Sequence, residues 1–386
     1  MRNKKSEIPE IGIGMLGYKF MGKAHSVGYL KMPYMFWPPP AIPKLIKICG
    51  RNKHEVKEAS KRYGYLGYCT DWHEIINDNQ IAIFVNGGIN NIHAEPCIEA
   101  AKNGKHIVCE KPLAKNAVEA KKMLDAVLKA KIKHICNFNY RQVPAVTLAK
   151  KLVMEGKIGK IYHFRASYLQ EWAVDPSLPL IWNFDKDIAG SGTVGGLSHI
   201  VDLARWFCGE PESITAFTKT FIKERPLISN NSKKGRVTVD DAYASILEFK
   251  NGALGLLEGS NMCLGRKNYE VFEINGELGS IYWNLEDLND LYVYFKEEKY
   301  NDTKGFHKIS VTESYHPYYD KWWPHGHTIG WGDTFVHTAF NIINAVINDV
   351  KLEPMIATFE DGYKAAVICD AILKSAETGK KTKITY

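Results

Sequence analysis

The stretch IGIGMLGYKFMGKAH, residues 11–25, decides the fold. A short apolar run ends at Gly17, and the residues from Gly22 onward can continue as a helix. A buried strand followed by a tight turn and a helix aims the amide groups of the helix N-terminus at the pyrophosphate of a dinucleotide. The stretch therefore predicts a dinucleotide-binding domain.

The turn in this stretch departs from the usual glycine pattern. Against G-x-G-x-x-G, Gly17 and Gly22 fill the outer positions, but Lys19 stands where a glycine normally lets the backbone approach the phosphates. Lys19 could offer its ammonium group to phosphate, or its side chain could weaken binding. Together with Phe20 and Met21, these residues form the loop that we expect to hold the cofactor.

Strand-like and helix-like segments alternate through the first 140 residues. Apolar runs recur at 44–49, 81–86, 106–112 and 133–140, and helical patterns occupy 53–64, 93–104 and 117–131. This alternation indicates a parallel, doubly wound sheet. We therefore predict an α/β protein whose Rossmann domain covers residues 1–140.

The end of the second predicted strand bears on the choice of cofactor. Enzymes that use NAD usually place an acid there against the ribose hydroxyls, whereas this chain has Gly50, Arg51 and Asn52. A glycine leaves room for a 2′-phosphate and the guanidinium of Arg51 supplies a cation for it. The sequence favours NADP(H), with NAD(H) as the alternative; Arg51 could also be an ordinary solvated loop residue.

Length and composition exclude several classes of protein. A chain of 386 residues predicts two domains. The net charge of +7 has neither a basic run nor a reader motif with it, so we expect no nucleic-acid partner. There is no signal peptide, no long apolar span and no CxxC pair among the eight cysteines. We expect a cytoplasmic protein with reduced thiols and no membrane partner.

The second half has its own α/β pattern. Alternating apolar and polar residues at 243–249, 253–260 and 269–275 predict half-buried strands, and 332–349 and 359–376 predict amphipathic helices. We assign residues 141–386 to a C-terminal domain for substrate binding and oligomerisation, with a last helix that can pack back on the first domain.

Several stretches together resemble the glucose–fructose oxidoreductase / inositol dehydrogenase (Gfo/Idh/MocA) family. They are MGKAHSVGYLKMP (21–33), FWPPPAIP (36–43), GKHIVCEKPLA (104–114), FNYRQVPAV (138–146), SHIVDLARW (198–206) and FEINGELGSIYWN (272–284). The proline-rich insert and the FNYR stretch resemble its levoglucosan dehydrogenase-like members. The resemblance implies a Rossmann domain and a C-terminal domain with a large open, mostly antiparallel sheet that often forms homodimers or homotetramers. It also implies hydride exchange between a nicotinamide and a secondary alcohol of a sugar, anhydrosugar or cyclitol.

Glu110, Lys111 and Pro112 close a predicted strand at the carboxyl edge of the sheet, where ligands of doubly wound folds bind. A lysine there can stabilise a developing alkoxide and take part in proton transfer. The resemblance implies that Lys111 lies between nicotinamide and substrate and that the proline peptide is often cis. A surface lysine at a strand end is the alternative. We expect Glu110 to border the cofactor.

His199 begins a predicted helix, and the resemblance implies that it is an acid or base beside the reacting hydroxyl. The family places an aspartate four residues before this histidine, but here that position is Gly195, or Gly196 if one residue has been lost. Without a neighbouring carboxylate, His199 should be less basic and less firmly held. A core or helix-capping histidine is the rival interpretation.

No other acid is assigned to the role of the missing aspartate. Asp185 and Asp187 could loop back, although nothing in the sequence shows it. Proton transfer could then fall to Lys111 together with His199, or to His199 through water.

The remaining candidates concern the sugar and a possible metal. Sugars bind to aromatic faces and to polar side chains. With His199, the substrate-binding candidates are Asn139, Tyr140, Arg141, Tyr168, Gln170, Trp172 and His327, and His93 is expected to line the cofactor groove. His325, His327, Asp333 and His337 have spacing that could hold a metal, but the family uses none, and we expect none.

The leading interpretation is an NAD(P)-dependent oxidoreductase that acts on a CH–OH group of a sugar, anhydrosugar or cyclitol. One alternative is a glycoside-cleaving enzyme that oxidises its substrate transiently before elimination. Another is a non-catalytic nucleotide-binding sensor, favoured by Lys19 and the missing aspartate.

Overall fold

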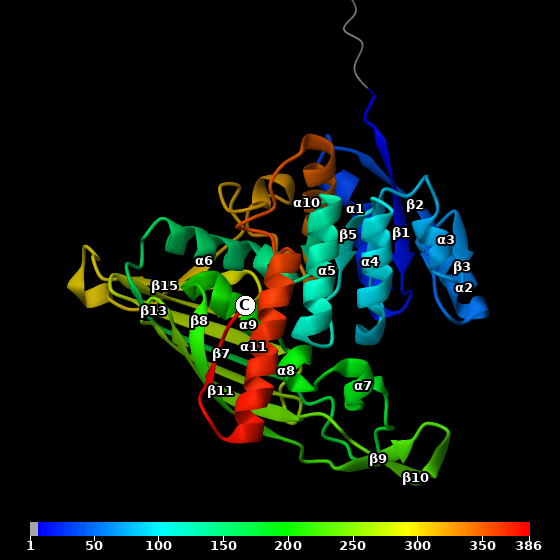
Figure 1. Ribbon diagram of the computed structural model, residues 1–386. Helices are drawn as coiled ribbons and strands as arrows, with labels where there is room; N and C mark the ends of the chain where they lie inside the picture. Colours follow the sequence, from blue (N-terminus) through cyan, green and yellow to red (C-terminus); the bar gives the residue numbers. More distant parts are fainter. Residues whose placement is uncertain (1–6) are drawn as a thin grey trace, which may run out of the picture.

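The computed structural model describes residues 7–386, and its N-terminal part is built on a parallel sheet (Figure 1). The strands are β1 (Glu10–Leu16), β2 (Ile42–Cys49), β3 (Gly67–Cys69), β4 (Ile83–Asn86), β5 (His106–Cys109) and β6 (His134–Cys136). Their order, β3-β2-β1-β4-β5-β6, reverses direction between β1 and β4. This is a doubly wound sheet, as the sequence predicted, and its carboxyl edge is the natural place for a ligand.

Helices cover both faces of this sheet. The strands can be buried in this way because their residues are mostly apolar. The helices are α1 (Phe20–Met35), α2 (Lys53–Tyr63), α3 (His73–Ile76), α4 (Ala94–Lys102) and α5 (Ala117–Ala130). The proline-rich stretch follows α1 as a loop with a cis peptide between Trp37 and Pro38. The strand expected over 133–140 ends at Cys136, and the chain turns instead into a short 3-10 helix, η2 (Asn139–Gln142), whose four side chains are buried.

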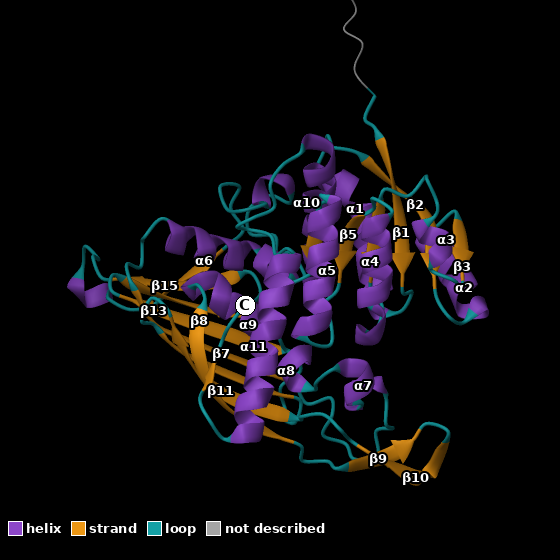
Figure 2. Ribbon diagram, viewed as in Figure 1, coloured by secondary structure: helices purple, strands orange, loops and turns teal. Residues whose placement is uncertain are grey.

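The C-terminal part is built on a nine-stranded sheet, drawn in orange at the lower left of Figure 2. Its strands are β7 (Ile161–Leu169), β8 (Pro211–Lys219), β11 (Ala242–Phe249), β12 (Leu254–Ser260), β13 (Tyr269–Gly276), β14 (Gly279–Asn284), β15 (Asp290–Phe295), β16 (His307–Ser310) and β17 (Thr382–Lys383). The order is β16-β15-β14-β13-β7-β12-β11-β8-β17, and β7 and β12 form its parallel pair. The mixed, largely antiparallel sheet agrees with the expectation. A separate hairpin, β9 (Glu224–Leu227) and β10 (Asn230–Arg236), extends beyond it.

One face of this sheet is covered by helices. Its strands alternate buried and more exposed residues, as the sequence indicated, and the buried set faces the helices. The helices beside the sheet are α6 (Pro144–Met154), α8 (Thr193–Gly196), α9 (His199–Cys208) and α11 (Phe359–Thr378), and the short α7 (Lys186–Ala189) lies apart from it (Figure 1).

The last two long helices join the halves of the molecule. Helix α10 (Thr334–Asn348) packs against α1, and α11 packs against both α5 and β8. Thr358 and Asp361 form a capping box that begins α11. Within residues 7–386, no helix has the length and apolar character that crossing a bilayer requires.

Candidate active site

The glycine loop forms an open cradle at the start of α1. Gly17 has a φ of +101°, which favours glycine, and a Cβ there would approach the carbonyl oxygen of Gly87 to 2.6 Å. A Cβ on Gly22 would overlap the carbonyl of Gly17. Because the two glycines keep the turn tight, the free amides at the N-terminus of α1 are left open to bind phosphate. The loop fits the pyrophosphate of a dinucleotide.

The other loop residues do not fill this cradle. The exposed ammonium of Lys19 lies 3.5 Å from the carboxylate of Glu55. Phe20 is exposed and stacks on Trp331, with 5.3 Å between ring centroids. Met21 lies beside the turn after β4. A Cβ built on Gly87 in that turn would lie 3.3 Å from the Cβ of Met21. Lys19 therefore leaves the backbone accessible to an anion.

Beside the end of β2, where the sequence analysis expects the ribose, lies a carboxylate that it missed. A Cβ on Gly50 would overlap the ring of Tyr18, whose hydroxyl donates to Glu55 at 2.8 Å. Asn52 caps α2 by accepting from two backbone amides, and Arg51 is exposed. Glu55 lies one turn inside α2, which is why a search at the end of β2 did not find it.

Glu110 and His93 fix the backbone at the end of the central strands. The buried carboxylate of Glu110 accepts from Asn137 at 2.7 Å and lies 2.8 Å from Nε2 of His25. The ring nitrogens of His93 lie 2.9 Å from the Pro112 carbonyl oxygen and 3.1 Å from that of Gly88. Both predicted cofactor residues therefore have protein partners at the carboxyl edge of the sheet.

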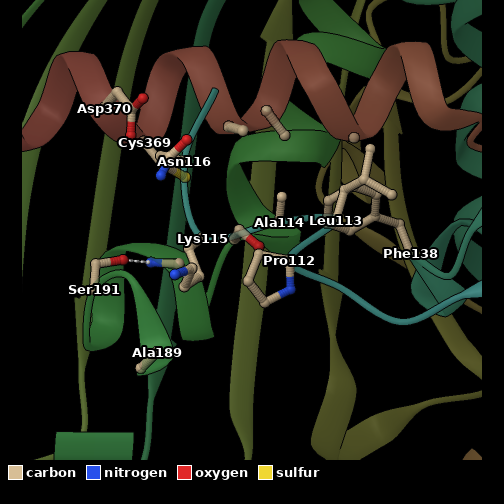
Figure 3. Close-up of a pocket in the computed structure, with 15 residues that line it drawn as sticks. Pro112, Leu113, Ala114, Lys115, Asn116, Phe138, Ala189, Ser191, Cys369 and Asp370 are labelled. Atoms are coloured by element: carbon tan, nitrogen blue, oxygen red, sulfur yellow. Dashed lines mark hydrogen bonds between the residues drawn. The ribbon is translucent and has the colours of Figure 1, made fainter. Parts of the chain in front are cut away.

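The loop that follows Lys111 is firmly held. The peptide between Lys111 and Pro112 is cis. Figure 3 shows the segment from Pro112 to Asn116 between helix α11, which carries Asp370, and the turn with Ala189 and Ser191. The amide of Ala117 donates to Asp370 at 2.9 Å. These contacts fix the backbone from which the Lys111 side chain extends.

Lys111 reaches across the cleft to the segment before His199. Its Nζ donates to the carbonyl oxygen of Gly196 at 2.6 Å. Burial lowers the pKa of Lys111, although the negative charges of Glu110 and Glu270 oppose that shift. The structure thus brings the lysine after β5 to the end of α8, three residues before His199 begins α9.

His199 is the first residue of α9 and is almost fully buried. Its ring lies 4.3 Å from the ring of Tyr140 and 6.2 Å from that of Tyr168, measured between centroids. Nδ1 has no hydrogen-bond partner among the described residues. Burial lowers the pKa of His199 well below its usual value, and the charge of Lys111 lowers it further. This direction agrees with the expectation that His199 is less basic, and its causes are burial and Lys111.

No carboxylate from the helix segment reaches His199. Gly195 donates its amide to Ser191 Oγ at 2.9 Å, and a Cβ there would lie 2.7 Å from that oxygen. Asp185 caps α7 by accepting from the amide of Asp187. Asp240, a residue that the sequence analysis did not consider, caps α8 through the amide of Val194 at 3.0 Å. None of these acids replaces the absent aspartate.

A cleft of about 1270 Å³ opens beside Lys111. Predicted residues Gln170 and Trp172 line it, and Trp172 stacks on Phe184 with 5.5 Å between centroids. Its other lining residues are Phe20, Asn90, Pro112, Ile181, Trp182, Asn183, Ala189, Ser191, Gly192, Gly196, Leu197, Val239, Asp240, Asp241 and Asn261. Aromatic faces beside amides and hydroxyls are the surroundings that suit a sugar.

Other predicted substrate residues lie outside this lining. Arg141 donates to both oxygens of Asp202, at 2.7 and 2.5 Å, so its guanidinium is committed to a buried ion pair. Asn139 donates to Thr334 at 2.8 Å, and exposed His327 contacts its own loop through Pro324. Sequence reasoning could not separate these roles, because a polar residue at a strand end serves a sugar or a protein partner equally well.

The rings of Tyr140 and Tyr168 lie beside His199, and their hydroxyl groups form a small hydrogen-bonded group. Their hydroxyls lie 3.3 Å apart, and Tyr168 donates to Asn268 at 2.8 Å. Gln170 donates to the same Asn268 oxygen at 2.7 Å, which connects this hydrogen-bonded group to the cleft.

The histidines near residue 330 have separate partners. His337 accepts from Trp322 at 2.7 Å, and Asp333 pairs with Lys31 at 2.6 Å. Within residues 7–386, no three His, Cys, Asp or Glu side chains are arranged to hold a metal ion.

Comparisons with known proteins agree with this geometry. The family model described as "Oxidoreductase family, NAD-binding Rossmann fold" matches residues 11–138, and the GFO/IDH/MocA C-terminal domain matches residues 146–282. The chain is 42% identical to a levoglucosan dehydrogenase of Pseudarthrobacter phenanthrenivorans over 95% of this chain and 96% of that protein. A solved levoglucosan dehydrogenase in complex with NADH and L-sorbose superposes with a TM-score of 0.94 at 42% identity, covering 98% of this chain and 100% of that one. A myo-inositol 2-dehydrogenase of Thermotoga maritima is 27% identical over 75% of this chain and 84% of that enzyme.

Proposed function

The chain belongs to the GFO/IDH/MocA oxidoreductase family, and from that premise we propose that the cleft beside Lys111 oxidises a secondary alcohol of a neutral anhydrosugar or a closely related sugar. The protein is an NAD(P)-dependent sugar oxidoreductase. The observation that carries the finer proposal is the meeting of Lys111 with the segment of His199 beside an aromatic, amide-rich cleft.

The proposed roles follow from the chemistry of the two side chains. When bound, the nicotinamide accepts a hydride from the carbon that carries the hydroxyl group. Lys111 donates a hydrogen bond to the hydroxyl oxygen and stabilises the negative charge that develops there. Nε2 of His199 takes the hydroxyl proton. The low pKa of His199 keeps the imidazole neutral before the reaction, so Nε2 can accept a proton.

The lining residues support an uncharged substrate. Lys111 is the one cation among the described residues that line the cleft, and the acids there, Asp240 and Asp241, already accept from backbone amides. A phosphorylated sugar would lack a second cation. The 42% identical levoglucosan dehydrogenase makes levoglucosan the first substrate to test.

The test is a screen of neutral sugars, anhydrosugars, cyclitols and sugar phosphates with NAD⁺ and NADP⁺. We expect saturable formation of reduced nicotinamide with neutral anhydrosugars and little with sugar phosphates. Cofactor binding without turnover on any of these compounds would contradict the proposed substrate class. Product release without net cofactor reduction would indicate transient oxidation and elimination instead.

The proposed cofactor is NAD(H), with NADP(H) also accepted. NAD(H) is supported by the related levoglucosan dehydrogenase solved with NADH. That relative gives no support to a preference for NADP(H), which depends on the exposed cation of Arg51 alone. The hydrogen bond from Tyr18 and the charge of Lys19 lower the pKa of Glu55, which leaves an ionised carboxylate near the expected ribose position.

We also propose that the open face of the nine-stranded sheet binds a second copy of this chain, as homodimer or homotetramer. Phe217, Ile246 and Leu256 are exposed on that face, and contiguous apolar surface of this kind usually marks an interface. Light scattering of the wild type and of Phe217→Glu tests the idea. A monomeric wild type would contradict it.

A reducing, cytoplasmic location remains part of the proposal. None of the eight cysteines forms a disulfide, and Cys263 alone is more than slightly exposed. Cells that express a tagged form of this protein can be fractionated to test the location. The tagged protein should be found in the cytoplasmic fraction.

A further inference from the structure

Glu270 is a buried acid that strand β13 directs toward the helix layer. Glu270, Phe272 and Ile274 are buried, whereas the residues between them are less buried. The ring of Phe272 lies 4.9 Å from that of Phe207 on α9, between centroids, so this face of β13 packs against the helix that His199 begins. Residues two apart on a strand share a face. Glu270 therefore points toward the same layer.

The register of the sheet puts Glu270 in one row with two tyrosines. Glu270 is opposite Tyr168 on β7, Tyr168 is opposite Gly259 on β12, and Gly259 is opposite Tyr243 on β11. A Cβ on Gly259 would overlap the Tyr243 ring, so the glycine lets that ring lie over the row. The ring of Tyr168 lies 6.2 Å from His199. The row thus crosses the sheet directly behind the histidine.

Polar atoms in this region have no partners. Both carboxyl oxygens of Glu270, the hydroxyl of Tyr243 and Nδ1 of His199 are buried without a hydrogen bond among the described residues. A buried carboxyl group without partners is costly, and such groups concentrate at functional sites. Unpartnered buried atoms of this kind are the partners that a buried water binds, two to four to each water.

The charges that act on Glu270 come from two other elements. Burial raises its pKa well above the usual value; Lys111, after β5, opposes this shift, and Asp202, on α9, adds to it. The surrounding tyrosines, Tyr140, Tyr168 and Tyr243, all have raised pKa values, mainly through burial. They stay protonated and cannot take a proton from His199.

The imidazole alone is a poor final acceptor for the substrate proton. Burial and Lys111 both disfavour a positive charge on His199, and release of the Nδ1 proton as Nε2 takes one keeps the imidazole neutral. The carboxyl group of Glu270 has the opposite preference, because its environment favours the protonated form. His199 therefore favours releasing a proton, and Glu270 favours holding one.

We propose that Glu270 replaces the missing helix aspartate as the proton-accepting partner of His199. This inference rests on the proposed function. In oxidation, the reactive form of the enzyme has Glu270 ionised, and its raised pKa means that this form is populated only as pH rises. The substrate O–H bond then breaks and its proton goes to Nε2; the Nδ1–H bond breaks and that proton goes to the Glu270 carboxylate, directly or through one buried water. The hydride leaves the same carbon for the nicotinamide, the C–O bond becomes C=O, and the imidazole remains neutral. Glu270 acts through His199 and is a positioning residue.

The experiment compares Glu270→Gln with the wild type, and Glu277→Gln, an exposed acid just after β13, is the matched control. We expect Glu270→Gln to lower kcat about 10- to 100-fold, the size of effect that loss of a carboxylate behind a histidine has in metal sites, with the sugar KM changed less than about threefold. The fall of kcat at lower pH that comes from protonation of Glu270 should disappear from the kcat–pH profile. Glu277→Gln should match the wild type.

Two further results keep the test decisive. Glu270→Asp should recover part of kcat and its fall at lower pH, because it restores a titrating carboxyl. Circular dichroism and NADH binding establish that each variant is folded. A folded Glu270→Gln enzyme with wild-type kcat and pH profile would overturn this inference while leaving the proposed function intact. A wild type that oxidises no neutral sugar would instead contradict the proposed function.

Discussion

Helix α9 contributes to two groups of ionisable residues that differ in how well they are paired. In the first, Arg141 binds Asp202 and Asp361, and Arg205 binds Asp361 and Glu210. Although burial raises the pKa values of Asp361 and Glu210, the guanidinium groups lower each to about 2. Every charge in this paired cluster has an opposite charge at hydrogen-bond distance.

The second group consists of Lys111, His199 and Glu270. Lys111 donates only to a backbone carbonyl, and the other two have buried polar atoms without partners. Burial shifts all three pKa values toward the neutral forms. The paired cluster stabilises the fold, whereas this unpaired cluster keeps its groups free to exchange protons with a substrate. The following substitutions test that division.

The largest effect is expected for Lys111→Met. Loss of the hydrogen bond to the reacting oxygen should lower kcat about 10⁴-fold, which equals about 5.5 kcal/mol of transition-state stabilisation. Thermal stability should not fall, because Lys111 has no charged partner at ion-pair distance among the described residues. Steady-state kinetics and a melting curve measure both. Lys115→Met, four residues along in the same loop, is the control and should keep kcat within about threefold.

The next effect is expected in the paired cluster. Arg141→Met leaves Asp202 buried without its partner, so the free energy of unfolding should fall by about 4 kcal/mol. The KM for sugar should stay within about threefold of the wild type at a temperature where the variant is folded. Denaturant titration and kinetics check this. A stable variant with a strongly raised KM would return Arg141 to the substrate site, where the sequence analysis put it.

Glu270→Gln provides a smaller effect on stability, with a definite dependence on pH. The folded pKa of Glu270 is raised, so its stabilising contribution is complete below the unfolded pKa of about 4.3 and is lost as pH rises through the folded value. The glutamine variant does not titrate. It should therefore become more stable than the wild type as pH rises, by about 2 kcal/mol at pH values near 8. Equal pH dependence of unfolding in both proteins would show that Glu270 is not the buried acid described.

The smallest effect concerns an exposed charge that has no ion pair among the described residues. Arg51→Ala should raise the KM for NADP(H) about tenfold, or about 1.4 kcal/mol, and leave the KM for NAD(H) unchanged. Kinetics with both cofactors measure the ratio. An unchanged KM for NADP(H) would make Arg51 a solvated loop residue.

Local patterns made much of the fold predictable. The apolar run before Gly17, the alternation of strands and helices, and the period-two pattern of 269–275 each specify an element from neighbouring residues alone. Lys111 and His199 were recognisable because each occurs in a short sequence motif. The paired partners of Arg141 were not, since Asp202 and Asp361 lie 61 and 220 residues away.

The role of Glu270 was not predicted from the sequence. Its position two residues before Phe272 indicates the buried face of a strand, and an acid on such a face was a signal that could have been used. Its neighbours, however, depend on the register of four strands, which hydrophobic alternation does not specify. The role of the acid therefore required the structure.

The most direct test of this division is a structure of the enzyme with NADH and a sugar that it oxidises. We expect one sugar hydroxyl oxygen to lie within about 3.2 Å of both Nζ of Lys111 and Nε2 of His199, while Arg141 stays bound to Asp202. A sugar whose hydroxyls bind Arg141, with Lys111 and His199 out of hydrogen-bond reach of the carbon that faces the nicotinamide, would contradict this expectation.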